Sequence, residues 1–397
     1  MRRVGIFCGF FNPPLDCHIA AAEAALQRYA LDEIVIAPLL TARGDTWENA
    51  GYIDRVCMCI ASVFMKSGLS VIERPSPASL PQLLRWYRKK QPDVRLFCIL
   101  DVALFASFTG RQSDAAALNN VGFICLSPNE TESGTVSRYA LSEGIDMDPM
   151  PFPSLSDAES AARNRIHSMN DPEGMAPGAL KICALHGLYL EDHAHDVKNA
   201  LNNHRWHHTL GVRTTAVALA EKFGASPVKC AAAALYHDCA KDMNPKEMRR
   251  IMTAHGEDGD EELLQSGAMM HGPVGAYIAE EKYHVRDREV LDAIRYHTSG
   301  REEMTLTDLV IFVADAIEPG REDYPGLNEI RTLSGIDLRA AALYSLYVTR
   351  DYVLSRGKSF HKSGQNTITA LERRLSGDGD LDPKAKKMLR ERSAAFD

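Results

Sequence analysis

The apolar residues in the first half of the chain gather in short runs bounded by polar residues, glycine or proline. These runs predict buried strands at Arg3–Cys8, Glu33–Leu40, Leu69–Ile72, Val94–Leu100 and Val121–Leu126. The composition between them predicts helices at Ile19–Tyr29, Tyr52–Met65 and Leu80–Lys89. Because strands that alternate with helices form parallel sheets covered on both faces, we expect an α/β doubly wound sheet.

The second half follows a different pattern, with helical periodicity and no strand-like runs. Apolar residues from Val212 to Phe223 keep a period of about 3.6 positions, and the pattern stops at Gly224. Similar stretches predict helices at Pro227–Ala240, Val274–Lys282, Glu289–Tyr296, Thr307–Ile317 and Leu338–Ser355. This half is therefore predicted to be an all-α bundle.

The change of pattern divides the chain of 397 residues into two domains, as expected above roughly 100–200 residues. Residues 127–144 are polar and irregular, and 156–189 look helical apart from helix breakers at 170–177. We place the first domain at 1–189 and the second at 195–375. The polar end, 376–397, is expected to be a loose tail that carries at most a short exposed helix.

Composition is typical of a soluble, cytoplasmic protein. Hydrophobic residues make up 45% and charged residues 25% of the chain, and no apolar run reaches the roughly 18 residues of a membrane span. The apolar start at 4–7 is too short for a secretory signal. The 9 cysteines include no CxxC pair, which fits reduced thiols. The net charge of −8 argues against a nucleic-acid partner, and we expect no membrane partner.

Most of the 14 histidines lie in the second half, because residues 1–189 contain only His18, His167 and His186. The predicted helices of the second half also carry aspartates, which gives the candidate ligand set His208, His237, Asp238 and Asp315. Two imidazoles and two carboxylates suit a divalent ion of Fe, Mn, Co or Zn. Such an ion lowers the pKa of bound water, and a second ion can clamp a phosphate.

Two further histidines, His271 and His297, can complete this site or hold a second ion, with Asp238 as the bridge. Taken singly, each histidine is more often a packing or surface residue than a metal ligand. The joint order of the ligands favours the metal site.

The residues around these positions resemble the HD phosphohydrolases. The likeness is carried by Arg-Trp-His-His-Thr-Leu-Gly-Val at 205–212, Ala-Leu-Tyr-His-Asp-Cys-Ala-Lys-Asp at 234–242, and the stretches 271–277, 294–301 and 313–321. Over about residues 195–375 the chain is similar to the HD family that cleaves diadenosine tetraphosphate symmetrically into two ADP. The resemblance implies that His208, His237, Asp238 and Asp315 bind the first metal ion, while His271 and His297 complete the site or hold a second ion.

If the chain is such a phosphohydrolase, the candidate catalytic residues are Asp238, Lys241 and Arg321. Lys241 lies one helical turn after Asp238 and can neutralise a phosphate oxygen, and Arg321 can clamp another. Arg295 and Arg301 are weaker candidates, and a solvated salt bridge is an equal alternative for each arginine. The remaining histidines considered are taken as surface or packing residues: His204, His207, His255, His284 and His361.

The first strand runs into Gly-Phe-Phe-Asn-Pro-Pro-Leu-Asp-Cys-His at 9–18, which resembles the phosphate-binding turn of nicotinate-nucleotide adenylyltransferases. Such a turn needs close backbone approach to phosphate at a helix N-terminus. Further likeness is carried by residues 160–166 and 175–189, by Arg55, and by Leu100-Asp101. The resemblance implies a nucleotidylyl-transferase-like (Rossmann-like) fold, with Gly9, His18, Ser160 and Arg163 contacting Mg-ATP.

This half also departs from the adenylyltransferase pattern. Leu15 replaces the first motif histidine, Cys17 and Cys8 replace glycines, and Ser127 stands where an arginine is expected. The family's Pro-Pro-His-Lys segment is absent around 41–46. Because loss of one phosphate donor costs on the order of 10²–10³ in rate, we expect a degenerate domain. Helix capping or packing is the alternative role of His18.

The leading hypothesis is a metal-dependent diadenosine tetraphosphate hydrolase fused to a degenerate nucleotidyltransferase-like domain, with iron favoured as the metal. The first alternative is a bifunctional enzyme that also adenylylates nicotinate mononucleotide to deamido-NAD. The second is a nucleotide-binding stress sensor without turnover. In each case the partner is a small-molecule nucleotide, and a homodimer remains open.

Overall fold

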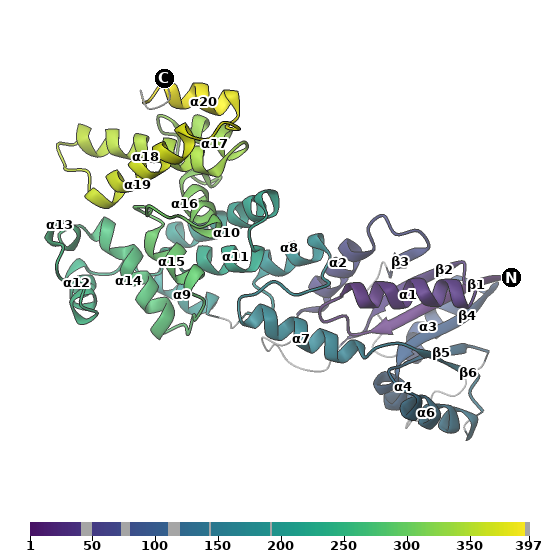
Figure 1. Cartoon of the computed structure of the whole chain (residues 1–397). Helices are drawn as coiled ribbons and strands as arrows, with labels where there is room; N and C mark the ends of the chain where they lie inside the picture. Colours follow the sequence, from purple (N-terminus) through teal and green to yellow (C-terminus); the bar gives the residue numbers. More distant parts are fainter. Residues whose placement is uncertain (41–49, 73–79, 110–119, 143, 191–192, 394–397) are drawn as a thin grey trace. The chain divides into compact units, whose positions relative to one another are not determined.

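The computed structural model describes residues 1–40, 50–72, 80–109, 120–142, 144–190 and 193–393 (Figure 1). The chain splits into two compact units. The first comprises Met1–His167 and Pro172–Leu190, and the second comprises Ser168–Asp171 and Glu191–Asp397. The first is called the sheet unit here and the second the helical unit.

The sheet unit contains a 6-stranded sheet with the order β3-β2-β1-β4-β5-β6, in which every pairing is parallel. The strands are β1 (Arg2–Gly9), β2 (Glu33–Pro38), β3 (Leu69–Val71), β4 (Val94–Asp101), β5 (Gly122–Ser127) and β6 (Met147–Pro151). The α/β doubly wound fold is confirmed. The strand order reverses at β1 and β4, so the carboxyl ends of these strands border the crevice where such folds bind ligands.

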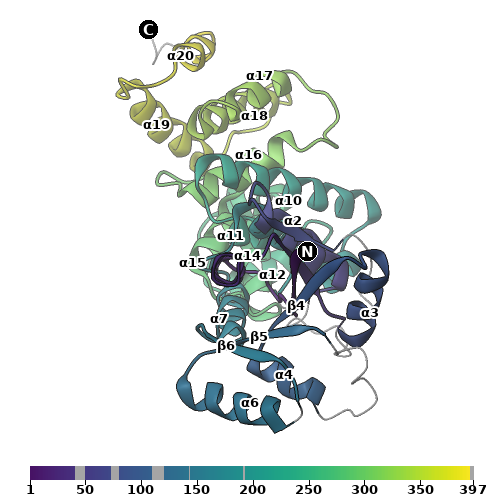
Figure 2. The ribbon, with the colours of Figure 1, turned by 90° about the vertical axis from the view of Figure 1, so that its right-hand side faces the viewer.

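Helices cover both faces of this sheet (Figures 1 and 2). Along β1, Val4 and Ile6 face one apolar core and Phe7 faces the other, because successive side chains of a strand alternate. The first core is closed by α3 (Leu80–Lys90), α4 (Val102–Thr109) and α6 (Glu130–Ser142). The second is closed by α1 (Asp16–Arg28), α2 (Tyr52–Val63) and α7 (Leu155–His167), and α8 (Pro177–His186) packs on α2.

Two elements of the sheet unit differ from the sequence expectation. Residues 127–144, expected to be irregular, contain α6, which buries only Val136 and Ala140 and so shows little apolar periodicity. The strand β6 was not expected because it contains Pro149 and Pro151. Proline is tolerated there because β6 is an edge strand.

The helical unit contains helices alone among its described residues, which confirms the all-α expectation. In chain order they are α9 (Ala194–Ala200), α10 (Asn203–Phe223), α11 (Pro227–Tyr236), α12 (Pro245–Ala254), α13 (Glu261–Leu264), α14 (Gly267–Glu281), α15 (Arg288–Tyr296), α16 (Leu306–Ile317), α17 (Leu327–Ser334), α18 (Leu338–Ser355), α19 (Lys362–Ser376) and α20 (Pro383–Arg390). The alanine run 231–234 of α11 is almost fully buried, which lets neighbouring helices approach closely. Among the described helices, none is long and apolar enough to cross a bilayer.

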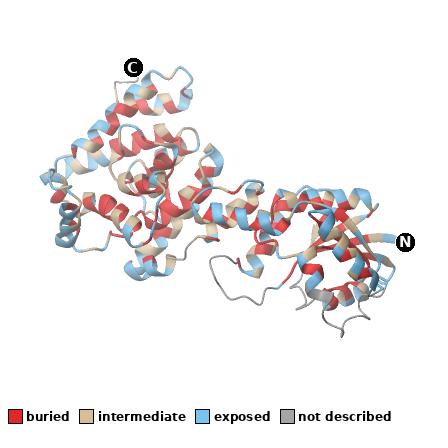
Figure 3. Cartoon of the chain, turned by 60° about the horizontal axis from the view of Figure 1, so that its bottom comes forward, coloured by how far each residue is buried: buried red, intermediate tan, exposed pale blue. Residues whose placement is uncertain are grey.

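Helix α20 is anchored, in contrast to the loose tail expected over 376–397 from the sequence. Asp382 caps α20 by accepting hydrogen bonds from the backbone N–H groups of Lys384 and Ala385. Leu381, Ala385 and Leu389 are buried in the main core of the helical unit. Figure 3 shows buried segments on helices of both units. The three buried residues of the tail recur every four positions among charged residues. They form a narrow apolar stripe, which the high mean polarity of the segment did not indicate.

We predict that Leu389→Ala destabilises the helical unit by about 2–5 kcal/mol, because the side chain is fully buried and its loss leaves a cavity. Urea unfolding followed by circular dichroism measures the change. The control is Leu354→Ala on α18, where the side chain is 55% exposed. Equal unfolding midpoints for the two variants would show that the tail is not part of the core.

Candidate metal centre

The candidate ligands come from separate helices that meet in the helical unit. His208 lies on α10, His271 on α14 and Asp315 on α16. His237 and His297 are the C-cap residues of α11 and α15. Nδ1 of His237 donates to the carbonyl oxygen of Ala234 at 2.8 Å, and Nδ1 of His297 to that of Ile294 at 2.7 Å. Because Nδ1 of each ring donates to the backbone, Nε2 is the nitrogen left to face the site.

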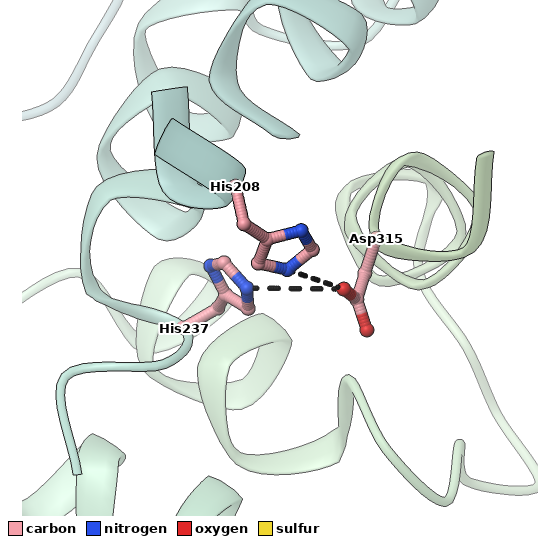
Figure 4. A group of neighbouring side chains, drawn as sticks. All are labelled: His208, His237 and Asp315. Atoms are coloured by element: carbon pink, nitrogen blue, oxygen red, sulfur yellow. Dashed lines mark ion pairs between the residues drawn. The ribbon is translucent and has the colours of Figure 1, made fainter. Parts of the chain in front are cut away.

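The first ligand group is His208, His237 and Asp315, whose side chains point toward one another (Figure 4). The Oδ1 atom of Asp315 lies 2.9 Å from Nε2 of His208 and 4.0 Å from Nε2 of His237. Oδ2 of Asp238 lies 3.8 Å from Nε2 of His208 and 3.6 Å from Nε2 of His237. These four residues therefore surround one position.

The second ligand group is Asp238, His271 and His297. Oδ1 of Asp238 lies 3.2 Å from Nε2 of His271 and 3.6 Å from Nε2 of His297. The two Nε2 atoms are 2.9 Å apart. Since Oδ2 of Asp238 faces the first group and Oδ1 faces the second, this carboxylate lies between the two groups, as a bridging ligand would.

Unpartnered polar atoms support a metal at these positions. His208, His237 and Asp238 are buried, yet Nε2 of each histidine and Oδ1 of the aspartate have no hydrogen-bond partner. Buried polar atoms are normally paired, so several such atoms that face one another require an explanation. A set of imidazole nitrogens and carboxylate oxygens fits divalent transition metals.

The ionisation states also suit metal binding. Burial lowers the pKa of His237 and of His271 to about 4, which keeps both rings neutral near pH 7. Burial acts to raise the pKa of Asp238, but the adjacent His237, His271 and His297 and the charge of Lys241 hold that pKa well below its ordinary value. The Asp315 pKa is likewise lowered, because His208 and Arg321 outweigh its burial. The site thus combines the neutral rings of His237 and His271 with two ionised carboxylates.

Glu318, which sequence reasoning missed, holds His208 from behind. Its Oε1 accepts from Nδ1 of His208 at 3.1 Å, and its Oε2 accepts from the backbone N–H of Gly320 at 2.6 Å. Glu318 fits there because Gly211 faces it, where a Cβ atom would come within 2.4 Å of Oε2. The residue stands in the motif 313–321, but only its position after α16 shows that it meets His208.

Charged side chains surround the ligands. Nζ of Lys241 lies 3.0 Å from Nε2 of His271 and 3.6 Å from Oδ1 of Asp238. Arg321 donates to Oδ1 of Asp315. Arg205, also missed by the sequence reasoning, lies 2.9 Å from Oδ2 of Asp238.

The two weaker arginine candidates form ion pairs of their own. Arg295 pairs with Glu257, and Arg301 pairs with Asp292 and Asp308.

Two cavities adjoin the ligand cluster. One of about 750 Å³ is lined at one end by His297, Asp315 and Arg321. The other, of about 360 Å³, is lined by His208 and Glu318. His208 of the smaller cavity and Asp315 of the larger one lie 2.9 Å apart, so the ligand cluster borders both cavities.

The candidate nucleotide residues of the sheet unit meet at the carboxyl end of β1. Gly9 ends β1, His18 lies in the first turn of α1, and Ser160 and Arg163 lie on α7. Arg163 donates to the carbonyl oxygen of Asn12 and to Oγ of Ser160, so it supports the turn from within.

His18 has internal partners for both ring nitrogens. Its Nδ1 accepts from the backbone N–H of Leu15 at 3.1 Å, and its Nε2 donates to Oε1 of Glu159 at 3.1 Å. The capping role, held as the alternative, is the one that the contacts describe. Residues 41–46, where the Pro-Pro-His-Lys segment was sought, lie outside the described residues. Arg55 is buried and donates to backbone carbonyls of Phe10, Leu39 and Ala50, which is a structural role.

Comparison with known proteins gives the family. The family model "HD domain" matches residues 205–320. The symmetrical bis(5'-nucleosyl)-tetraphosphatase of Bacillus subtilis is 44% identical over 167 residues, which cover 41% of this chain and 86% of that protein. The chain belongs to the HD family of symmetrical bis(5'-nucleosyl)-tetraphosphatases.

Two other relatives have names that include nicotinate-nucleotide adenylyltransferase. A probable nicotinate-nucleotide adenylyltransferase of Bordetella avium is 26% identical over 208 residues, covering 48% of this chain and 98% of that protein. A probable nicotinate-nucleotide adenylyltransferase/Ap4A hydrolase of Mycoplasma genitalium is 28% identical over 164 residues, covering 40% of this chain and 45% of that protein. All candidate metal ligands of this tetraphosphatase-family chain lie within the HD match.

We expect His237→Ala and Asp238→Ala to abolish bound divalent metal, because each variant removes a ligand from the cluster. Elemental analysis of the purified full chain measures the metal. The control is His255→Ala, whose ring stacks on Tyr277 and pairs with Glu281 outside the cluster. Full metal content in either ligand variant would exclude the assigned site.

Glu318→Ala should weaken metal affinity by about 10–100-fold, since a ligand histidine loses the carboxylate that orients it. Competition with a chelator measures the affinity. Glu318→Gln, which keeps an acceptor oxygen for His208, should lose less. An unchanged affinity in Glu318→Ala would mean that backbone packing alone orients His208.

Proposed function

We propose that the helical unit hydrolyses diadenosine tetraphosphate symmetrically to two ADP with one or two divalent transition-metal ions, iron being favoured over Mn, Co or Zn. The observation that carries this proposal is the position of Asp238 between two groups of buried histidines, with its Oδ1 and the Nε2 atoms of His208 and His237 lacking hydrogen-bond partners. The first group and Asp238 would hold one ion, and His271, His297 and Asp238 would hold the other. Such ions supply a nucleophile from water at neutral pH and stabilise charge on phosphate oxygens.

The residues of the chain itself prepare this chemistry. Backbone carbonyls orient His237 and His297, and Glu318 orients His208, so the three rings need no rearrangement to bind. Lys241 and Arg321 supply positive charge at the edge of the cluster, where they can bind phosphate oxygens.

Two cavities border the ligand cluster, which suits a substrate with a nucleoside at each end of a phosphate chain. Cleavage at the middle of that phosphate chain is the symmetrical outcome.

The sheet unit is proposed to be degenerate as an adenylyltransferase. Leu15 is buried at the N-cap of α1 and cannot donate to phosphate, and His18 is engaged internally. The bifunctional alternative requires Mg-ATP to bind at this turn, and the sensor alternative requires that no substrate be turned over.

Product analysis tests the proposed reaction. The metal-loaded full chain should convert diadenosine tetraphosphate into ADP as the sole nucleotide. Lys241→Met should lower turnover with metal content unchanged, because a cation is lost and no ligand is removed. Equal amounts of ATP and AMP would contradict symmetrical cleavage, and the absence of turnover would favour the sensor.

A coupled assay tests the sheet unit. With nicotinate mononucleotide, ATP and Mg²⁺, the full chain should form deamido-NAD very slowly or not at all, because phosphate donors are missing. The double variant Leu15→His with Cys17→Gly should recover part of the activity. Wild-type turnover at the roughly 1–10³ s⁻¹ usual for enzymes would support the bifunctional alternative.

A further inference from the structure

The larger cavity beside the metal ligands extends away from the region matched by the HD model. Its lining includes His297, Asp315 and Arg321. The lining residues from 324 onward, called the far wall here, include Tyr352 of α18 and Arg392, which follows α20. The HD match ends at residue 320, so the far wall lies beyond the matched region.

The chemistry of the far wall suits a flat, polar-edged group. Tyr324, Val348 and Tyr352 offer aromatic and apolar surface, and Tyr352 is 59% exposed. Thr349 and Asp351 add acceptors for hydroxyl or amino groups. A nucleobase stacks on aromatic side chains, and a cavity of about 750 Å³ falls within the usual range for ligand pockets.

Arg392 is held in position at this wall. Its NH1 donates to Oδ2 of Asp351 at 2.9 Å, and its guanidinium lies over the ring of Tyr344 at 5.0 Å. Helix α20 fixes the segment because Ala385 and Leu389 are buried. The C-terminal segment thus presents an oriented cation to the cavity.

We infer that this cavity binds one nucleoside of the substrate, and that Tyr352 and Arg392 determine affinity for it. The inference rests on the proposed function, since the cavity opens at the metal ligands. It assigns the C-terminal segment to substrate specificity.

The test compares ligands with and without a nucleoside on the metal-loaded full chain. Calorimetry should show ADP binding about tenfold weaker in Arg392→Ala and in Tyr352→Ala, with inorganic pyrophosphate binding unchanged. Because Tyr352 is exposed, its variant retains the fold if the arginine variant does not. The control is Arg390→Ala, an exposed arginine of the same segment that does not line the cavity.

The outcomes separate this inference from the proposed function. Unchanged ADP affinity in both variants, or an equal loss in Arg390→Ala, would overturn the nucleoside site even if diadenosine tetraphosphate is cleaved. A parallel loss of pyrophosphate binding would also overturn it, because the residues would then act on phosphate. Absence of hydrolysis by the wild type would count against the proposed function alone.

A separate observation concerns the turn of the sheet unit. The carboxylate of Glu159, which is 9% exposed, accepts from the backbone N–H of Asn12 at 3.1 Å and from Nε2 of His18 at 3.1 Å. The guanidinium of Arg163 lies 3.8 Å from its other oxygen. Asn12 lies between the end of β1 and the start of α1, and His18 lies in the first turn of α1, where the helix dipole favours an anion.

The geometry points to Glu159 as an internal anion that occupies the phosphate position of this turn. Glu159 and Asp101 also line the adjoining cavity of about 190 Å³, so a phosphate there would meet two carboxylates. The hydrogen-bond donors of the turn are thereby paired within the chain, and the turn is closed to a nucleoside triphosphate.

Hydrogen–deuterium exchange with ATP localises the effect to the peptide 9–18, independently of binding in the helical unit. Wild type should show no added protection there, whereas Glu159→Ala and Glu159→Gln should show it. The control is Glu173→Ala, where the carboxylate is 90% exposed. Protection in wild type, or its absence in both Glu159 variants with thermal unfolding still cooperative, would overturn the assignment.

Discussion

The helical unit depends on one buried carboxylate. Asp238 is ionised and almost inaccessible to water, and an isolated charge in that environment would cost several kcal/mol. Arg205 and Lys241 offset part of this cost from the rim, but Oδ1 still faces two histidine nitrogens without a hydrogen bond. A bound cation would complete the balance, and the five helices that carry the candidate ligands converge on this point.

Helix termini orient several of the candidate metal ligands. His237 and His297 each follow the last residue of a helix, and each donates to the carbonyl three residues earlier. Carbonyls at a helix C-terminus lack partners within the helix, so one contact satisfies a backbone oxygen and orients a ligand. Glu318, at the end of α16, serves His208 in a comparable way with a side-chain carboxylate.

The two units differ in whether the polar groups at their candidate sites have hydrogen-bond partners. In the helical unit, nitrogen and oxygen atoms remain unpaired at positions where a ligand can satisfy them. In the turn of the sheet unit, the corresponding donors are paired with Glu159 and with neighbouring backbone. A site that binds a ligand must leave such groups available, and a scaffold gains stability by pairing them.

The sequence by itself determined the two fold classes and the identity of the metal-ligand candidates. Short apolar runs that alternate with helical segments predict a sheet, and apolar residues at the helical period predict a bundle. His237, Asp238 and Asp315 lie among apolar residues, which predicts that they are buried in the bundle. Sequence periodicity did not reveal α6, β6 or the anchored α20, because each buries only a few residues.

Only the tertiary structure decided how the two oxygens of Asp238 are shared, that Glu318 supports His208, and that Arg392 reaches the cavity beside the ligands. It also decided that His18 meets Glu159, 141 positions away in the chain. These relations join residues that are distant in sequence and adjacent only after packing. No local pattern encodes them, because the free energy that fixes them is gained between elements.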